Sequence, residues 1–200
     1  MKLIGLLGGI ASGKSVVAKH LQSLGAAVLD ADRIGHDVLR LPEIKAAARA
    51  RWGDGIFSQD GEIARPALAK IVFAANQESQ RELEYLEELT HPEIRRRMST
   101  ELELLAASGV EVAVLDAPVM LKAGWNKLCD HLIFVDSPRE MRLAHALARG
   151  WTEAEFSERE SRQEPIEHKR ELADFVLDNS GPLEYTHGQI ERFWNRLAGT

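Results

Sequence analysis

The sequence predicts an α/β fold, a parallel five-stranded sheet flanked by helices, with a helical subdomain and a lid attached to it. Two observations lead to this prediction. Short apolar runs alternate with helical stretches along the 200 residues, an order that is typical of parallel strands covered by helices. The glycine-rich segment Gly8–Ser15 stands between the first apolar run and the first helical stretch, which gives the order strand, loop, helix.

The predicted strands are short apolar runs, and Gly or Pro marks the ends of several predicted helices. The strands are Lys2–Leu7, Ala26–Leu29, Val110–Leu115, Leu132–Val135 and Phe175–Leu177. The helices are Lys14–Leu24, Ile34–Arg40, Glu43–Trp52, Ala67–Ala75, Ser79–Leu89, a separate helix that begins at Pro92, Pro138–Arg149 and about Pro182–Leu197. Pro is favoured in the first turn of a helix, so Pro92 is interpreted as a start. The stretch at 52–66 is rich in Gly and Asp and predicts a loop.

The first loop fits the pattern G-x-x-x-x-G-K-[ST] at every fixed position, since Gly8–Ser15 reads GGIASGKS. Its glycines permit positive φ and leave backbone N–H groups open to a phosphate. Lys14 can reach the β- and γ-phosphates, and Ser15 offers a hydroxyl to Mg²⁺. The helix that follows points its N-terminus at the same anion. The sequence therefore predicts a phosphate-binding loop (P-loop) for a nucleoside triphosphate.

Two carboxylates follow the second predicted strand, in the stretch Asp30-Ala31-Asp32. Ligands of an open parallel sheet bind outside the carboxyl ends of its strands, so both groups are candidates for Mg²⁺ or for the phosphoryl acceptor. Residues two apart on a strand point the same way, but the two side chains diverge if a turn breaks the alternation. Either Asp could instead cap the helix that follows. Asp116 ends the third strand and stands alone there.

A charged segment lies between Arg149 and Arg170 and holds six Glu and five basic residues, Arg149, Arg159, Arg162, Lys169 and Arg170. One interpretation is a solvated helical hairpin. The other is a mobile lid that brings Arg onto a transferring phosphoryl group. The presence of a P-loop in the same chain favours the lid.

Composition restricts the remaining functions. The net charge of −6 argues against a general nucleic-acid binder. No apolar stretch approaches the roughly 18 residues of a membrane span, and Leu3–Leu7 is too short for the apolar part of a secretion signal. The single cysteine, Cys129, suits a reducing compartment, and the seven histidines show no zinc-ligand spacing. These features predict a cytoplasmic protein without membrane or nucleic-acid partners, as a monomer or small homo-oligomer.

Three classes of P-loop protein compete: a small-molecule kinase, a GTPase switch, and an ATPase or nucleotide-sensing module. Asp32–Gly35 fits the GTPase pattern D-x-x-G, but it leaves little room for a switch loop before it. Asn126–Cys129 resembles the guanine motif N-K-x-D, with Cys129 in place of the aspartate. An ATPase module would usually have an apolar strand that ends in two adjacent acidic residues. Here Asp116 stands alone at the end of the third strand, which argues against this class. A kinase fits better because phosphoryl transfer needs a phosphate cradle, a carboxylate near the acceptor and mobile cations.

The ordered motifs resemble the dephospho-coenzyme A kinase family over about Leu3 to Asn195. The resemblance rests on GLLGGIASGKS, LGAAVLDADRIGH, DGEIARPALAKIVF, LEELTHPEIRRRM and RQEPIEHKRELADFVLDNSG. It implies the P-loop kinase fold, with a nucleotide core at about 1–33, 109–150 and 171–200. It also implies a helical substrate-binding subdomain at about 34–108 and a lid at about 151–170. Another small-molecule or nucleotide kinase is the alternative.

The resemblance also implies the reaction and the residues that carry it. The γ-phosphate of ATP would pass to the ribose 3′-hydroxyl of dephospho-CoA, with Mg²⁺ as cofactor. Asp32, Lys14 and Arg149 would be catalytic, and Ser15 would bind Mg²⁺ with Asp32 or Asp116 through water. ATP would contact Gly8, Gly9, Ile10, Ala11, Ser12, Gly13, Lys14, Ser15, Val16 and Asn179. The substrate would contact Asp32, Arg65 and His91.

Three positions depart from the family pattern. Lys122 replaces an acidic residue after the third strand, and His145 replaces an arginine four residues before Arg149. Val16 replaces a threonine that commonly follows Ser15. The departures concern details of substrate or metal contacts and leave the loop and Asp32 unchanged.

Overall fold

The structure is a computed structural model that describes residues 1–74 and 76–197. It divides into two compact units, Met1–Asp30 with Leu102–Thr200, and Ala31–Glu101. Each unit has a hydrophobic core of its own. Among the described residues, no helix combines the length and the apolar character that crossing a membrane requires.

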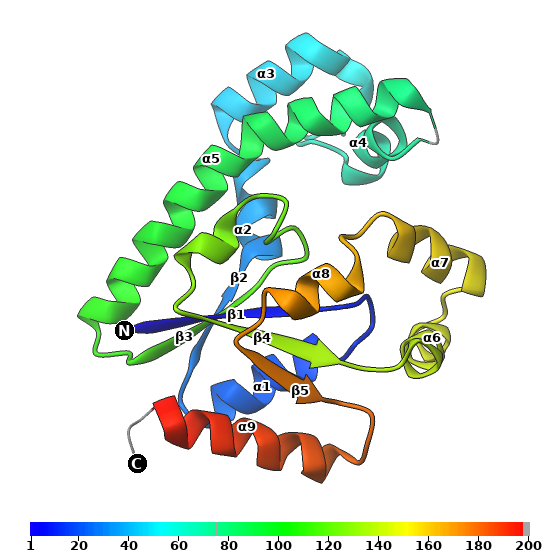
Figure 1. Cartoon of the computed structure of the whole chain (residues 1–200). Helices are drawn as coiled ribbons and strands as arrows, with labels where there is room; N and C mark the ends of the chain where they lie inside the picture. The colour runs from blue at the N-terminus through cyan, green and yellow to red at the C-terminus, as the bar shows by residue number, and fades with distance from the viewer. Residues whose placement is uncertain (75, 198–200) are drawn as a thin grey trace. The chain divides into compact units, whose positions relative to one another are not determined.

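The first unit is built on one five-stranded sheet with the order β2-β3-β1-β4-β5 (Figure 1). All neighbouring strands are parallel, which confirms the predicted sheet. The strands are β1 (Lys2–Gly8), β2 (Ala27–Asp30), β3 (Val112–Asp116), β4 (His131–Asp136) and β5 (Phe175–Asp178). Because β1 lies between β3 and β4, its carboxyl end lies at the switch point where such sheets bind ligands.

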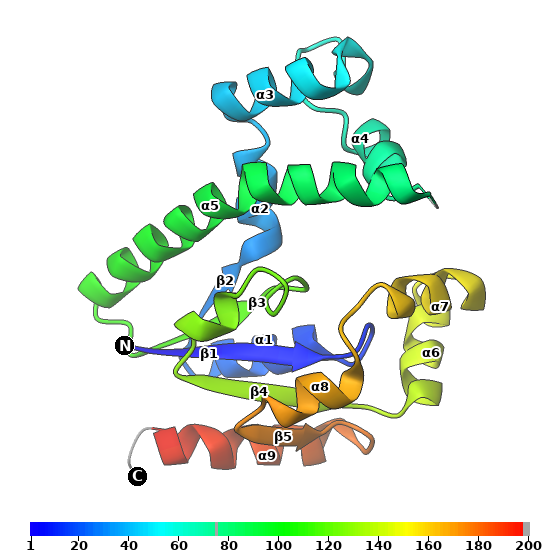
Figure 2. The same cartoon turned by 45° about the horizontal axis from the view of Figure 1, so that its top comes forward.

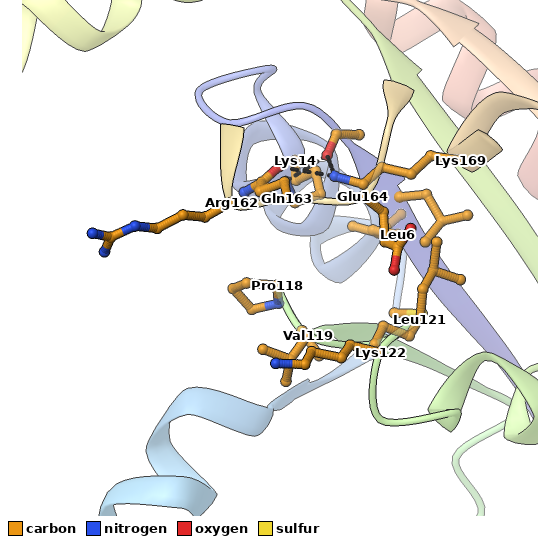
Figure 3. Close-up of a pocket in the computed structure, with 14 residues that line it drawn as sticks. Leu6, Lys14, Pro118, Val119, Leu121, Lys122, Arg162, Gln163, Glu164 and Lys169 are labelled. Carbon is orange, nitrogen blue, oxygen red and sulfur yellow. Dashed lines mark hydrogen bonds between the residues drawn. The ribbon is translucent and has the colours of Figure 1, made fainter. Parts of the chain in front are cut away.

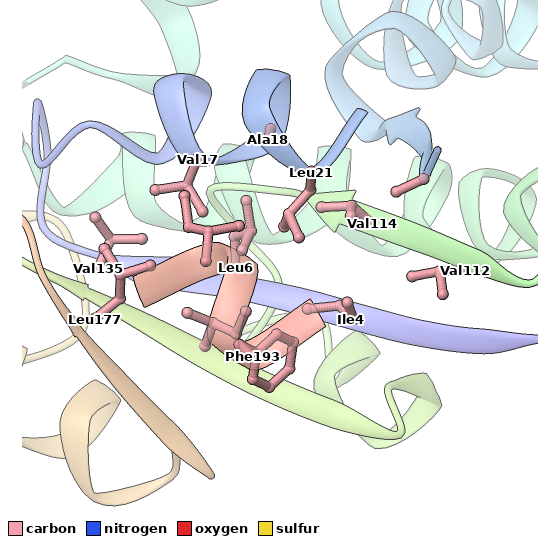
Figure 4. Packing of buried hydrophobic residues seen from close by; sticks show 13 residues of the cluster. Ile4, Leu6, Val17, Ala18, Leu21, Val112, Val114, Val135, Leu177 and Phe193 are labelled. Atoms are coloured by element: carbon pink, nitrogen blue, oxygen red, sulfur yellow. The ribbon is translucent and has the colours of Figure 1, made fainter. Parts of the chain in front are cut away.

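Helices α1 (Lys14–Ser23) and α9 (Leu183–Leu197) pack together on one face of this sheet. The core between them combines alternate residues of the strands with one side of each helix (Figure 4). Its members include Ile4, Leu6, Val112, Val114 and Val135 of the sheet and Val17, Leu21, Ile190 and Phe193 of the helices. The other helices of this unit are α6 (Arg139–Ala148), α7 (Glu153–Ser161), α8 (Ile166–Glu171) and the 3₁₀ helix η2 (Trp125–Leu128).

The second unit is helical. It contains α2 (Ala31–Val38), α3 (Pro42–Trp52), the 3₁₀ helix η1 (Asp54–Ile56), α4 (Arg65–Val72) and most of α5 (Gln77–Ala107). Its core is formed by Ala48, Ile56, Ile63, Leu68 and Val72. Ile56 and Ile63 lie within the predicted loop at 52–66, where an antiparallel bridge joins Phe57 to Ile63. Residue 75, the end of one predicted helix, lies outside the described residues.

The prediction of a separate helix at Pro92 is wrong, because α5 runs through this proline without interruption (Figure 2). Proline removes one backbone hydrogen bond from a helix interior. The buried stripe of Thr90, Ile94 and Met98, at four-residue spacing, nevertheless continues from one side of Pro92 to the other. Burial of this stripe favours one helix over two.

Candidate active site

The loop Gly8–Ser15 joins the end of β1 to the start of α1. Gly13, the residue before the helix, has φ 95°, a left-handed conformation that favours glycine. A Cβ atom at this position would lie 2.4 Å from Nδ2 of Asn179. Ala11 also has positive φ, 57°. The helix has no acidic residue in its first turn, so nothing there competes with an anion at its N-terminus.

Three side chains from distant parts of the chain hold the carbonyl groups of this loop. The Ser12 carbonyl accepts hydrogen bonds from Ser137 Oγ and Asn179 Nδ2, both at 2.9 Å. His145 Nδ1 lies 3.0 Å from the Ala11 carbonyl oxygen. A carbonyl and the next N–H in a planar peptide point in opposite directions. The Gly13 N–H therefore points away from Ser137 and Asn179, which orients it for a phosphate.

Lys14 folds back over the loop. Its Nζ donates to the carbonyl oxygens of Gly8 at 3.5 Å and Gly9 at 3.3 Å. Burial lowers the pKa of the Lys14 ammonium, Asp116 partly opposes this effect, and Arg142 and Arg149 add to it. A cation that burial and neighbouring cations disfavour is stabilised by an anion, so the loop favours a phosphate here.

Arg142 of α6 is a site residue that the sequence analysis did not single out. Its side chain is buried, and a Cβ atom at Gly9 would lie 2.7 Å from its Nη1. The guanidinium pairs with Glu160 at 2.6 Å and donates to the Ser137 carbonyl at 3.1 Å. The helical spacing of the sequence could have indicated Arg142. It stands four residues before the buried Ala146 and therefore lies on the same side of α6, where a charged residue is unusual.

Two carboxylates lie at the carboxyl end of the sheet. Asp30 of β2 and Asp116 of β3 are register partners on adjacent parallel strands. Side chains alternate along each strand, and Val28 and Val114, two residues earlier, pack in the core beneath α1. Asp30 and Asp116 therefore point to the face that carries α1, where Asp116 acts on Lys14.

Asp32 belongs to the second unit and lies in the first turn of α2, which begins directly after Asp30. The strand alternation therefore ends at Asp30 and does not extend to Asp32. Arg65 and His91 also lie in the second unit, at the start of α4 and within α5. Arg65 lines a cavity of about 640 Å³ whose other lining residues are apolar: Leu39, Ile63, Pro66, Leu68, Ala69, Val72, Phe73 and Leu86. The catalytic and substrate-binding roles of these three residues stay predictions.

The charged segment after Arg149 forms α7 and α8. Glu160 bridges two arginines of α6, accepting from Arg139 at 3.0 Å and from Arg142 at 2.6 Å. The predicted lid arginines have other partners, since Arg159 stacks on Trp151 at 4.0 Å and Arg162 pairs with Glu158 at 2.6 Å. Arg149 is the C-cap residue directly after α6, and its charge lowers the pKa of Lys14. Arg142 of α6 lies beside Gly9 of the loop, and Lys169 of α8 donates to the Gly8 carbonyl.

A cavity of about 160 Å³ opens beside the loop. Figure 3 shows Lys14 and Lys169 together on one side of it, with Pro118, Val119 and Lys122 on the other. Arg162 also borders the cavity, but its guanidinium points away.

The residues present fit Mg²⁺ held jointly with a nucleotide. Among the described residues, no group of three or more His, Cys, Asp or Glu side chains could hold a metal alone. Mg²⁺ commonly uses one or two protein oxygens together with substrate phosphates and water. Ser15, exposed in the first turn of α1, and Asp116 supply oxygens of this kind.

Comparison with known proteins identifies the family. The model of the dephospho-CoA kinase family matches residues 2–184. The chain belongs to this family. It is 40% identical over 193 residues to the dephospho-CoA kinase of Carboxydothermus hydrogenoformans, covering 95% of this chain and 91% of the relative. Family membership confirms the predicted class, an ATP-dependent dephospho-CoA kinase with the nucleotide-binding fold of P-loop kinases.

Solved structures agree with the observed fold. TT1252 from Thermus thermophilus superposes with a TM-score of 0.81 at 32% identity, over 98% of this chain and 97% of that one. The dephospho-CoA kinase of Campylobacter jejuni has a TM-score of 0.65 at 22% identity, over 98% and 97% of the two chains. At that identity the match concerns the fold alone.

Proposed function

We propose that this chain transfers the γ-phosphoryl group of ATP to the ribose 3′-hydroxyl of dephospho-CoA at the Gly8–Ser15 loop. The observation that carries the proposal is the loop itself. Side chains hold its carbonyls, and Lys14 and Arg142 contact it. Phosphoryl transfer depends mainly on positioning and charge stabilisation, and this loop is suited to both.

The loop amides and Lys14 hold the phosphates in this mechanism, with Gly8 to Val16 lining the nucleotide. Lys14 leaves the Gly8 and Gly9 carbonyls and moves to the β- and γ-phosphates. Ser15 would hold Mg²⁺, and Asp116 or Asp32 would contribute through water. When bound, Mg²⁺ neutralises charge on the phosphate oxygens.

Asp32 accepts the proton of the 3′-hydroxyl in this proposal. The family resemblance assigns it, and its place directly after β2 supports it, because ligands of such sheets bind beyond the carboxyl ends of the strands. Arg65 and His91 bind the dephospho-CoA side of the complex. Arg65 borders a largely apolar cavity, which suits a substrate with an apolar arm and charged phosphates.

Arg149 stabilises the transferring phosphoryl group in the proposed complex. Its effect on the pKa of Lys14 supports a position close to the phosphates. Asn179 lies near the adenine, and its hydrogen bond to Ser12 supports a place beside the nucleotide.

The proposed reaction divides the chain into a nucleotide core, a substrate subdomain and a lid. The nucleotide core consists of about residues 1–33, 109–150 and 171–200, the substrate subdomain of about 34–108, and the lid of about 151–170. We also propose a cytoplasmic protein that acts as a monomer or small homo-oligomer.

The position of transfer is tested with two acceptors that differ by one atom. Purified protein with ATP and Mg²⁺ should phosphorylate dephospho-CoA, and it should not phosphorylate the analogue that lacks the 3′-hydroxyl oxygen. Equal phosphate transfer to both acceptors contradicts the proposed position.

The role of Asp32 is tested by comparing Asp32→Asn with Asp30→Asn. Asp32→Asn keeps the shape of the side chain and removes the base, so kcat should fall by about 100-fold or more. Its affinity for ATP should change by less than about tenfold. Asp30→Asn should have the smaller effect on kcat. If Asp30→Asn is the inactive enzyme and Asp32→Asn only loses stability, as a lost helix cap would predict, the assignment is wrong.

A further inference from the structure

Lys169 reaches the P-loop from α8, within the segment that the sequence assigned to a lid. Its side chain is buried, with a relative exposure of 6%. The ammonium donates to the Gln163 side-chain oxygen at 2.8 Å and to the Gly8 carbonyl at 3.4 Å. A lysine is rarely buried to this extent unless it is paired. Gln163 and Gly8 are neutral partners, so these hydrogen bonds do not explain why a positive charge is buried at this position.

Lys169 shares the Gly8 carbonyl oxygen with Lys14, whose Nζ lies 3.5 Å from it. Both contacts are longer than the 2.7–3.2 Å that is usual for an N–H···O hydrogen bond. Two ammonium groups on one carbonyl repel each other, and Arg142 adds a third positive charge. Glu164 attracts Lys169 and Asp116 attracts Lys14. An anion between the two lysines would satisfy both.

The space for such an anion is the 160 Å³ cavity beside the loop, which both lysines line. Figure 3 shows their side chains at the same wall. The loop amides and the α1 N-terminus cradle the inner phosphates of a nucleotide, and the P-loop lysine reaches the β- and γ-phosphates. A second ammonium beside Lys14, at the strand end of the loop, therefore lies with the terminal phosphoryl group.

We propose that Lys169 is a second phosphate-binding lysine, which contacts the terminal phosphoryl group of the bound nucleoside triphosphate next to Lys14. The identity of the nucleotide as ATP rests on the proposed function. In the ligand-free protein the Gly8 carbonyl and Gln163 hold the ammonium in place. In the complex the phosphoryl oxygens replace the Gly8 contact, and Lys169 stabilises the charge that develops during transfer.

The electrostatics agree with this geometry. Burial, with Lys14 beside it, lowers the pKa of Lys169 to about 8. A phosphate in contact with the ammonium favours the charged form, so nucleotide binding near pH 8 is coupled to proton uptake.

The main test uses Lys169→Met, with Lys127→Met as control, because Lys127 is an exposed lysine of the same unit. Binding of ATP and of ADP is measured without acceptor. Lys169→Met should weaken ATP binding by about tenfold or more and ADP binding by less than about threefold, since only ATP carries the terminal phosphoryl group. It should lower kcat by about 30-fold or more and change KM for dephospho-CoA by less than about threefold. Lys127→Met should match the wild type.

Two results overturn the proposal. One is a Lys169→Met protein with wild-type kcat and wild-type affinity for ATP. The other is equal weakening of ATP and ADP together with a lower melting temperature, which indicates a structural role. The binding measurements contain no acceptor, so they test Lys169 even if dephospho-CoA is not the substrate.

A second measurement does not depend on the folding of Lys169→Met. Calorimetry of ATP binding in two buffers of different ionisation enthalpy gives the number of protons taken up. The wild type should take up more protons at pH 8 than Lys169→Arg, because a guanidinium stays protonated in both states. Lys169→Arg should also keep most of the ATP affinity, since it keeps the charge. Equal proton uptake by the two proteins overturns the proposal.

Discussion

Replacement of Gly13 by alanine tests whether the loop is held in shape by Asn179. Two separate costs are expected. The left-handed φ of 95° disfavours any side chain by about 1 kcal/mol. The new Cβ would lie 2.4 Å from Asn179 Nδ2 and displace the amide that bonds Ser12 at 2.9 Å and Thr186 at 2.8 Å. Each lost hydrogen bond costs about 1 kcal/mol, so Gly13→Ala should destabilise the protein by about 2–3 kcal/mol.

Gly109→Ala is the matched control for the backbone cost. Gly109 has a similar φ, 86°, and nothing lies within 4 Å of the position of its Cβ. Urea unfolding at 25 °C should give a loss of about 1 kcal/mol for this variant, with an unchanged slope against denaturant. In an Asn179→Ala background, Gly13→Ala should cost about as little as Gly109→Ala. The reasoning is refuted if Gly13→Ala in the wild-type background is no more destabilising than Gly109→Ala.

Three further predictions follow from the charges and the single thiol. Lys14→Ala should lower kcat/KM by at least about 100-fold without lowering the melting temperature, because burial already lowers the pKa of the ammonium; near-wild-type turnover contradicts this. Burial raises the pKa of Cys129 to about 12, so only a fraction of ~10⁻⁴ of this thiol is thiolate at pH 8. The folded protein should therefore not react with a disulfide reagent until it is unfolded. Rapid stoichiometric labelling of the folded protein contradicts this. The pKa of Lys169 is about 8 in the folded protein and 10.5 for the free side chain, so its destabilising effect is complete below pH 8 and is relieved as the pH rises to 10.5. The ligand-free wild type should therefore gain stability relative to Lys169→Met across that window, and a constant difference between the two proteins contradicts this.

The sheet and the loop could be predicted because each has a signal in the local sequence. Apolar runs mark the strands and Gly13-Lys14-Ser15 marks the loop, and the observed strand ends differ from the predicted ones by at most two residues. The run through Pro92 could not be predicted from Pro propensity, because a tertiary contact decides it. The buried side of α5, Thr90, Ile94 and Met98, outweighs the local preference of proline.

The residues that hold the loop were harder to find. Arg142 and Lys169 belong to segments whose sequence is typical of solvated helices, and only the folded chain brings them to Gly9 and Gly8. Ser137 gives no signal in the sequence, since its function is to hold the Ser12 carbonyl from 125 residues away. Contacts between residues far apart in the chain are not visible as spacing or periodicity.

The central claim, a kinase specific for dephospho-CoA, is tested most directly by comparing acceptors under identical conditions. Initial rates of phosphate transfer from ATP with Mg²⁺ are measured for dephospho-CoA, AMP, CMP, UMP and shikimate, with a reaction without acceptor as control. The account predicts that dephospho-CoA has by far the highest kcat/KM and that ATP is hardly hydrolysed without acceptor. Faster transfer to a mononucleotide or to shikimate, or ATP hydrolysis that does not depend on an acceptor, would contradict it.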